Sequence, residues 1–131
     1  MTTARPSRPR IVLADDHPHV LAAFGRLLGC SCEVVGSVSN GCEAVEAVMT
    51  LRPDVLVADL MMPHLNGLEV CRRVKQAAPE TAVVIVTAFA DAEVQKVALE
   101  AGASAMIPKH EAADALEPTI LQIFAERQDL L

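Results

Sequence analysis

Val55-Leu56-Val57-Ala58-Asp59 is an apolar run, rich in valine, that ends on a carboxylate. Because its apolar residues do not alternate with polar ones, the run predicts a parallel strand that is buried on both faces. Three other segments combine an apolar run with a polar or charged end in the same way. They are Ile11-Val12-Leu13-Ala14-Asp15-Asp16, Val83-Val84-Ile85-Val86-Thr87 and Ala105-Met106-Ile107-Pro108-Lys109.

The polar residues at the ends of these runs are expected to lie close together. The carboxyl ends of parallel strands meet at one edge of an open sheet, and ligands bind at that edge. The set comprises three carboxylates, a hydroxyl and an ammonium group, which suit a divalent metal ion and a phosphoryl group. Its members are Asp15, Asp16, Asp59, Thr87 and Lys109.

Length and composition limit the classes of protein that fit. The chain has 131 residues, 52% of them hydrophobic, which predicts one domain with an ample core. Its formal net charge of −6 argues against a large nucleic-acid-binding face, because phosphate binding requires a basic surface. No apolar run in the sequence is long enough to span a membrane, and the N-terminus does not have the pattern of a secretion signal. The cysteines are not spaced as zinc ligands usually are. A cytoplasmic protein without membrane contact is expected.

Strand-like and helix-like patterns alternate five times along the chain. Residues 33–36 predict one more strand, and helical patterns follow each strand, with starts near Pro18, Asn40, Gly67, Asp91 and Leu116. Pro118 should kink the last helix or delay its start, because proline cannot donate its backbone nitrogen to the preceding turn. This alternation predicts right-handed βαβ crossovers and a parallel sheet with helices on both faces.

The patterned region predicts the domain boundaries. Residues 10–127 should form the domain, and residues 1–9, which carry Arg5 and Arg8, should form a mobile N-terminal tail. Residues 128–131 are expected to leave the last helix as a C-terminal tail or the start of a linker.

At this point the chain resembles the receiver domain of the two-component response-regulator family, over residues 10–127. Asp15-Asp16 match the family's acidic pair and Asp59 its phosphoacceptor, while Thr87 matches its switch hydroxyl and Lys109 its lysine. Any single match is weak, but all of them occur in order within a fivefold strand and helix pattern.

The loop after Asp59 adds a longer motif. Residues 59–67, Asp-Leu-Met-Met-Pro-His-Leu-Asn-Gly, reproduce the family's D-x-x-M-P-x-x-x-G pattern. The resemblance implies an α/β fold of the flavodoxin-like (βα)5 type, a doubly wound parallel sheet with strand order 2-1-3-4-5.

The resemblance also implies a Mg²⁺ site. In it, Asp16 and Asp59 bind the metal directly, Asp15 acts through water, and the backbone carbonyl of Met61 contributes one more oxygen. Magnesium prefers hard oxygen ligands in an octahedral shell, which these groups provide. For the same reason His17 and His64, which flank the expected site, are not predicted to be ligands; His17 should lie at the start of the first helix.

Phosphoryl transfer is the function that the resemblance implies. A sensor histidine kinase would donate the phosphoryl group to Asp59, while Lys109 and Thr87 would stabilise its oxygens. The chain would catalyse its own phosphorylation and dephosphorylation and would not be a metabolic enzyme.

The output would follow from movement of Thr87. In the family, an aromatic residue on the fifth strand fills the space that the hydroxyl leaves, and that position is Met106 here. Methionine is flexible and can repack, so a switch remains possible without the aromatic side chain. The expected result is a homodimer that phosphorylation strengthens.

Asp15-Asp16-His17-Pro18 is similar to receivers attached to LuxR-type DNA-binding domains. The expected output is therefore transcriptional, through a domain absent from this chain, which itself should not bind DNA. One alternative is a freestanding receiver that docks on another protein, and another is an interaction module that is never phosphorylated.

Two further interpretations of the same residues remain. An aspartate after a strand often caps the next helix, although capping would have to explain each residue separately. A haloacid-dehalogenase-like phosphatase also uses an aspartate and magnesium, but it needs a second aspartate where this chain has Met61.

Overall fold

Five parallel strands form one sheet in the order β2-β1-β3-β4-β5, which confirms the predicted flavodoxin-like order 2-1-3-4-5. The computed structural model describes residues 8–129. The strands are β1 (Arg10–Ala14), β2 (Glu33–Val38), β3 (Val55–Asp59), β4 (Ala82–Thr87) and β5 (Ala105–Pro108).

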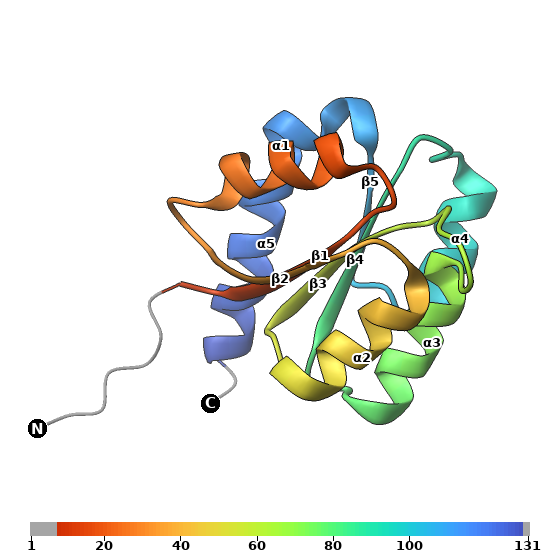
Figure 1. Ribbon diagram of the computed structural model, residues 1–131, viewed down its shortest axis with the longest axis horizontal. Helices are drawn as coiled ribbons and strands as arrows, with labels where there is room; N and C mark the ends of the chain where they lie inside the picture. Colours follow the sequence, from red (N-terminus) through yellow and green to blue (C-terminus); the bar gives the residue numbers. More distant parts are fainter. Residues whose placement is uncertain (1–7, 130–131) are drawn as a thin grey trace, which may run out of the picture.

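Helices cover both faces of this sheet (Figure 1): α1 and α5 lie on one face, and α2, α3 and α4 lie on the other. Their bounds are α1 (Pro18–Leu28), α2 (Gly41–Leu51), α3 (Gly67–Ala77), α4 (Ala92–Glu100) and α5 (Ala112–Asp129), with a single 3-10 turn, η1 (Lys109–Glu111), before α5. Within residues 8–129, none of these helices has the combination of length and apolar character that a membrane crossing requires.

The core consists of two clusters, one on each face of the sheet, and β3 contributes to both. Leu56 and Ala58 pack in the cluster beneath α2, α3 and α4, whereas Val55 and Val57 pack in the cluster beneath α1 and α5. Every residue of β3 and β4 is buried. Burial on both faces explains why these strands carry apolar runs without polar alternation.

Short polar side chains fix the starts of three helices. Asn40, Asn66 and Asp91 each accept a hydrogen bond from the backbone N–H three residues ahead, at the start of α2, α3 and α4 respectively. At the end of α4, Gly102 has φ +108° and its N–H donates to the Leu99 carbonyl, which is the role that its position in the sequence predicts.

The last helix differs from the prediction. Helix α5 begins at Ala112 and continues through Pro118, so a delayed start is wrong. Leu116 and Ile120, on either side of the proline, are fully buried, and this packing offsets the backbone hydrogen bond that the proline cannot donate. The helix also includes residues 128–129, which were expected to leave it.

At the other end, Pro9 is buried and its carbonyl accepts a hydrogen bond from Glu33 N–H at 2.8 Å, so packing begins one residue before the expected domain boundary. The rest of the two expected tails, residues 1–7 and 130–131, lies outside the described residues.

Candidate functional site

The carboxyl ends of strands β1, β3 and β5, and the residues just after them, bring three of the predicted polar residues together. Asp15 follows β1, Asp59 is the last residue of β3, and Lys109 follows β5. Asp15 is 3% exposed and Asp59 is 5% exposed, whereas Asp16 is exposed. Because the strands are parallel, the three side chains meet at one edge of the sheet, as the sequence predicts.

Lys109 joins the two buried carboxylates. Its Nζ lies 3.0 Å from Asp15 Oδ2 and 3.1 Å from Asp59 Oδ2. Partial burial acts to lower the pKa of Lys109, but the hydrogen bonds and charges of the two aspartates outweigh it and raise the pKa above its usual value. The Lys109 side chain is therefore held as a charged ammonium group between the carboxylates at the ends of β1 and β3.

The second oxygen of Asp59 is also engaged. The backbone N–H of Met61 donates to Asp59 Oδ1 at 3.3 Å. Burial raises the pKa of Asp59, with a smaller contribution in the same direction from Asp15, while Lys109 and the Met61 N–H act to lower it. The net shift of the Asp59 pKa is upward because the cost of burying its charge exceeds the stabilisation by Lys109 and the Met61 N–H.

Side chains of four residues form a compact set of potential metal ligands. One ligand atom from each of Asp15, Asp16, His17 and Asp59 lies within 4.8 Å of the others. Three carboxylates carry more negative charge than Lys109 neutralises, and carboxylate oxygens are the ligands that Mg²⁺ prefers. The donor set therefore fits a divalent cation of this type.

The contact of the His17 side chain with the acidic pair is the feature of the site that the sequence did not predict. Its Nδ1 lies 3.0 Å from Asp15 Oδ1 and 3.2 Å from Asp16 Oδ1. His17 is the residue before α1, as expected, but its side chain makes no capping hydrogen bond to the helix. Its immediate sequence position after Asp15-Asp16 was the only available signal. His64, by contrast, is exposed and is not part of the acidic set.

Thr87 lies at the end of β4 and is fully buried. Its Oγ1 accepts a hydrogen bond from the Phe89 N–H at 3.1 Å, so the hydroxyl proton is not used in this contact. Phe89 and Met61 are exposed apolar side chains in the loops that follow β4 and β3, at 62% and 58% exposure. Met106, in β5, is half-buried and packs against the core cluster beneath α2, α3 and α4.

Two glycines explain the path of the loop after Asp59. Gly67, the last residue of the D-x-x-M-P-x-x-x-G motif, donates its N–H to the Leu60 carbonyl, and a Cβ there would lie 2.5 Å from the Asp59 carbonyl oxygen. Gly41, at the start of α2, donates to the Pro63 carbonyl, and a Cβ there would lie 1.9 Å from the Leu65 carbonyl oxygen. Any other residue at these positions would push the loop away from Asp59.

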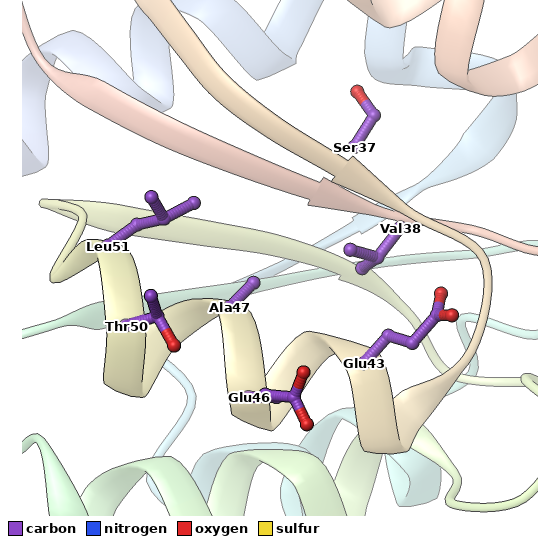
Figure 2. Close-up of a pocket in the computed structure, with 7 residues that line it drawn as sticks. All are labelled: Ser37, Val38, Glu43, Glu46, Ala47, Thr50 and Leu51. Atoms are coloured by element: carbon purple, nitrogen blue, oxygen red, sulfur yellow. The ribbon is translucent and has the colours of Figure 1, made fainter.

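Two grooves described on the surface do not contain the acidic set. A groove of about 440 Å³ lies between β2 and α2, where Ala47 and Leu51 extend from the helix toward the strand (Figure 2). A second groove, of about 460 Å³, lies between α1 and the start of α5 and reaches Lys109 at one end. The acidic set lies outside both grooves, and its charged side chains suit a small charged group.

Comparison with known proteins gives a consistent result. The sequence model of the response regulator receiver domain family matches residues 11–121 of this chain. "Response regulator MprA" of Mycobacterium ulcerans is 36% identical over 100 residues, which are 76% of this chain and 43% of that protein. "Uncharacterized transcriptional regulatory protein YhcZ" of Bacillus subtilis is 35% identical over 99 residues, 73% of this chain and 46% of that protein. The chain thus spans less than half the length of these curated relatives.

Among solved structures, the signal receiver domain of the putative response regulator NarL from Mycobacterium tuberculosis superposes with a TM-score of 0.80. Its sequence is 28% identical, and the match covers 92% of this chain and 96% of that one. The similarity therefore extends over nearly the whole of both chains.

Proposed function

The chain belongs to the response regulator receiver domain family, and from this premise we propose that Asp59 accepts a phosphoryl group from a sensor histidine kinase. The observation that carries the proposal is the environment of Asp59. A buried carboxylate lies 3.1 Å from an ammonium group at the edge of the sheet, beside two further aspartates. Two-component signalling by aspartyl phosphate is the activity that this arrangement supports best.

In the proposed reaction, an Asp59 oxygen attacks phosphorus, a new O–P bond forms, and the bond from phosphorus to the donor breaks, with its electron pair leaving on the donor. Charge develops on the phosphoryl oxygens in the transition state, so positioned positive charge and hydrogen-bond donors accelerate the step. Lys109 supplies the charge. Thr87 supplies a hydroxyl proton, which its bond with Phe89 leaves free.

Asp15, Asp16, Asp59 and the Met61 carbonyl would hold Mg²⁺ in this proposal. When bound, the ion neutralises the mutual repulsion of the carboxylates and phosphoryl oxygens. Lys109 pairs with both Asp15 and Asp59, and these contacts fix the positions of two of the three carboxylates.

Intact-mass spectrometry tests the proposal directly. The protein is incubated with acetyl phosphate, a small phosphoryl donor, in the presence of Mg²⁺ or of EDTA. We expect the mass of one phosphoryl group to be added only with Mg²⁺. If the folded protein gains no mass, the phosphorylation-independent interaction module becomes the better interpretation.

Substitution of Lys109 by Gln should slow phosphoryl uptake by about 10²–10³-fold, the usual effect of removing one group that stabilises transition-state charge. The control is Lys96→Gln, which removes an equal charge from the exposed face of α4. Uptake is followed by mass against time, after circular dichroism has shown that both variants are folded. Equal rates for Lys109→Gln and the wild type would contradict the role of Lys109.

Phe89 is exposed in the loop just after β4, and its backbone N–H binds Thr87. An apolar ring at this position would hinder the approach of water to a phosphoryl group on Asp59, so substitution of Phe89 by Ala should shorten the lifetime of the phosphorylated protein about tenfold. Leu121→Ala, which removes an exposed apolar side chain from α5, is the matched control. The measurement is the decay of the phosphorylated mass after the donor is removed. An unchanged decay in Phe89→Ala would show that this ring does not protect the acyl phosphate.

We further propose that the switch signal passes from Thr87 through the Phe89 N–H to the loop before α4, with Met106 repacking in place of an aromatic residue. The 3.1 Å hydrogen bond between Phe89 and Thr87 supports this route, because it couples the backbone of the loop to the hydroxyl. Phosphorylation should therefore shift the amide resonances from Thr87 to Met106, and unchanged resonances would exclude the route.

A transcriptional output is the proposed use of the switch. The relative YhcZ is described as a transcriptional regulatory protein, and Asp15-Asp16-His17-Pro18 is similar to LuxR-type receivers. In this proposal, phosphorylation strengthens a homodimer of this chain, and the dimer controls a separate output domain. The description of YhcZ and the similarity to LuxR-type receivers are both consistent with this output. Sedimentation of the phosphorylated and unphosphorylated protein distinguishes this from output by docking of a monomer.

A further inference from the structure

Strand β2 leaves one edge of the sheet open. Within residues 8–129 it pairs with β1 alone, so the backbone groups on its other side have no neighbouring strand. The Val38 carbonyl accepts a hydrogen bond from the Asp15 N–H, which directs the backbone groups of Val38 toward β1. Successive residues of a strand direct these groups to opposite sides, so the N–H and carbonyl of Ser37 face the open edge. The edge therefore offers hydrogen-bonding groups to an incoming strand.

The two edges of the sheet differ in how they are protected against pairing. At the opposite edge, β5 is four residues long and ends on Pro108, and both features hinder the addition of a strand. Strand β2 is six residues long and contains neither proline nor lysine. Its one irregularity is a bulge at Val35, which has no partner in β1, and regular pairing resumes over Gly36–Val38. The regular part of the open edge is thus the part beside the start of α2.

The groove between β2 and α2 adds a side-chain surface to this edge. Val38, Ala47 and Leu51 give it an apolar lining, and each of them is half-buried. Glu43 and Glu46, both exposed, are one helical turn apart on α2 and also line the groove (Figure 2). None of the residues described as lining it is basic. This lining suits lysine and arginine side chains, whose aliphatic stems cover apolar surface while their charged ends reach the carboxylates.

We propose that the open edge of β2 and this groove form a docking surface for an extended, basic segment of a partner protein, which adds to the sheet as a further strand. Main-chain hydrogen bonds to the edge supply affinity, and alternate side chains in the groove supply specificity. Every second residue of an added strand lies on the α2 side, so the segment carries arginine or lysine at alternate positions.

A second copy of this chain is a poorer occupant of the surface. A symmetric contact between two β2 edges brings Glu43 and Glu46 of both copies to one interface, and each chain has a formal net charge of −6. A basic segment instead neutralises these carboxylates. The surface does not include the acidic set at the strand ends, so the inference is independent of the proposed phosphoryl transfer.

Binding of three short fluorescent peptides to the full chain tests the proposal, with anisotropy as the readout. The first peptide alternates arginine and threonine, and the second alternates glutamate and threonine. The third is the first peptide with N-methyl groups on the backbone nitrogens along one edge, which removes the donors that would pair with β2 and keeps the charge. We expect the first peptide to bind, and the other two to bind about tenfold more weakly or less.

Two measurements locate the bound peptide. Glu46→Gln should weaken binding of the arginine peptide about three- to fivefold, the effect of losing one exposed ion pair. The matched control is Glu100→Gln, which removes an equal charge from an exposed position on α4 and should bind like the wild type. Hydrogen exchange followed by nuclear magnetic resonance should show slower exchange of the Ser37 amide in the complex, with the amides of β5 unchanged.

Each of the other outcomes overturns the proposal. Equal affinity for the arginine peptide and its N-methylated form, or unchanged Ser37 exchange at saturation, would show that β2 does not pair with the peptide. Equal affinities of Glu46→Gln and Glu100→Gln, both shown to be folded by circular dichroism, would exclude the groove as the site of the basic side chains. Slower Ser37 exchange at high protein concentration without peptide would assign the edge to a second copy of the chain.

Discussion

Replacement of Asp59 by Asn is expected to leave a folded protein that takes up no phosphoryl group from acetyl phosphate and Mg²⁺. An amide is not a nucleophile toward phosphorus, so the loss should be complete. The amide oxygen can replace only one of the two Asp59 oxygens that now accept hydrogen bonds, Oδ2 from Lys109 and Oδ1 from the Met61 N–H. The fold should nevertheless survive, because Lys109 keeps its 3.0 Å ion pair with Asp15. Burial raises the pKa of Asp59, which indicates that its charge is costly in the folded state, so the neutral side chain should not reduce stability greatly.

The same substitution at the opposite end of β3 provides the control. Asp54 immediately precedes this strand and accepts a hydrogen bond from the Arg10 N–H at 2.8 Å, far from the acidic set. Asp54→Asn should take up phosphoryl groups like the wild type. Intact mass reports the adduct, and circular dichroism reports the fold. A mass increase in Asp59→Asn at the wild-type rate would show that another residue is the acceptor.

Replacement of Gly41 by Ala is expected to lower the free energy of unfolding by about 2–4 kcal/mol. The added Cβ would lie 1.9 Å from the Leu65 carbonyl oxygen and 2.6 Å from the Leu65 Cβ. The nearest contact is backbone, so no rotamer change can relieve the clash. The loop between Asp59 and α3 must move away from α2, and the Gly41 N–H would lose its 3.3 Å hydrogen bond to Pro63.

Gly25→Ala is the matched control for this experiment. Gly25 lies inside α1, and a Cβ there would meet no atom within 4 Å. Alanine has the better helix propensity, so this variant should gain about 0.5–1 kcal/mol. Urea denaturation followed by circular dichroism measures both. Equal stabilities for the two alanine variants would show that the loop tolerates a side chain at Gly41 and would remove the explanation given for this glycine.

Sequence predicts the sheet and most of the site because both follow from properties of single segments. A strand buried on both faces must be apolar at every position, and β3 and β4 show this in the chain itself. Once such strands are parallel, the meeting of Asp15, Asp59 and Lys109 follows from topology alone. The assigned chemical roles of these residues and the domain limits stay predictions.

What sequence did not predict depends on contacts between specific atoms. The His17 ring lies against Asp15 and Asp16, and a sequence pattern does not distinguish a helix cap from a side chain that is directed at an acidic pair. Pro118 continues a helix against its local preference because the residues around it are buried in the core. The requirement for Gly41 comes from Leu65, which is distant along the chain and adjacent in space.

The complete burial of β3 and β4 also determines which parts of the protein can unfold locally and expose their backbone amides to solvent. Both strands have hydrogen-bonded neighbours on each side and helices on both faces, so their amide protons should exchange with solvent only when the whole domain unfolds. The loops that carry Met61 and Phe89 have exposed side chains and should exchange through small local openings. Asp59 lies at the boundary between these regions. A change at this residue can therefore redistribute the conformations of the loops while the sheet beneath them remains closed.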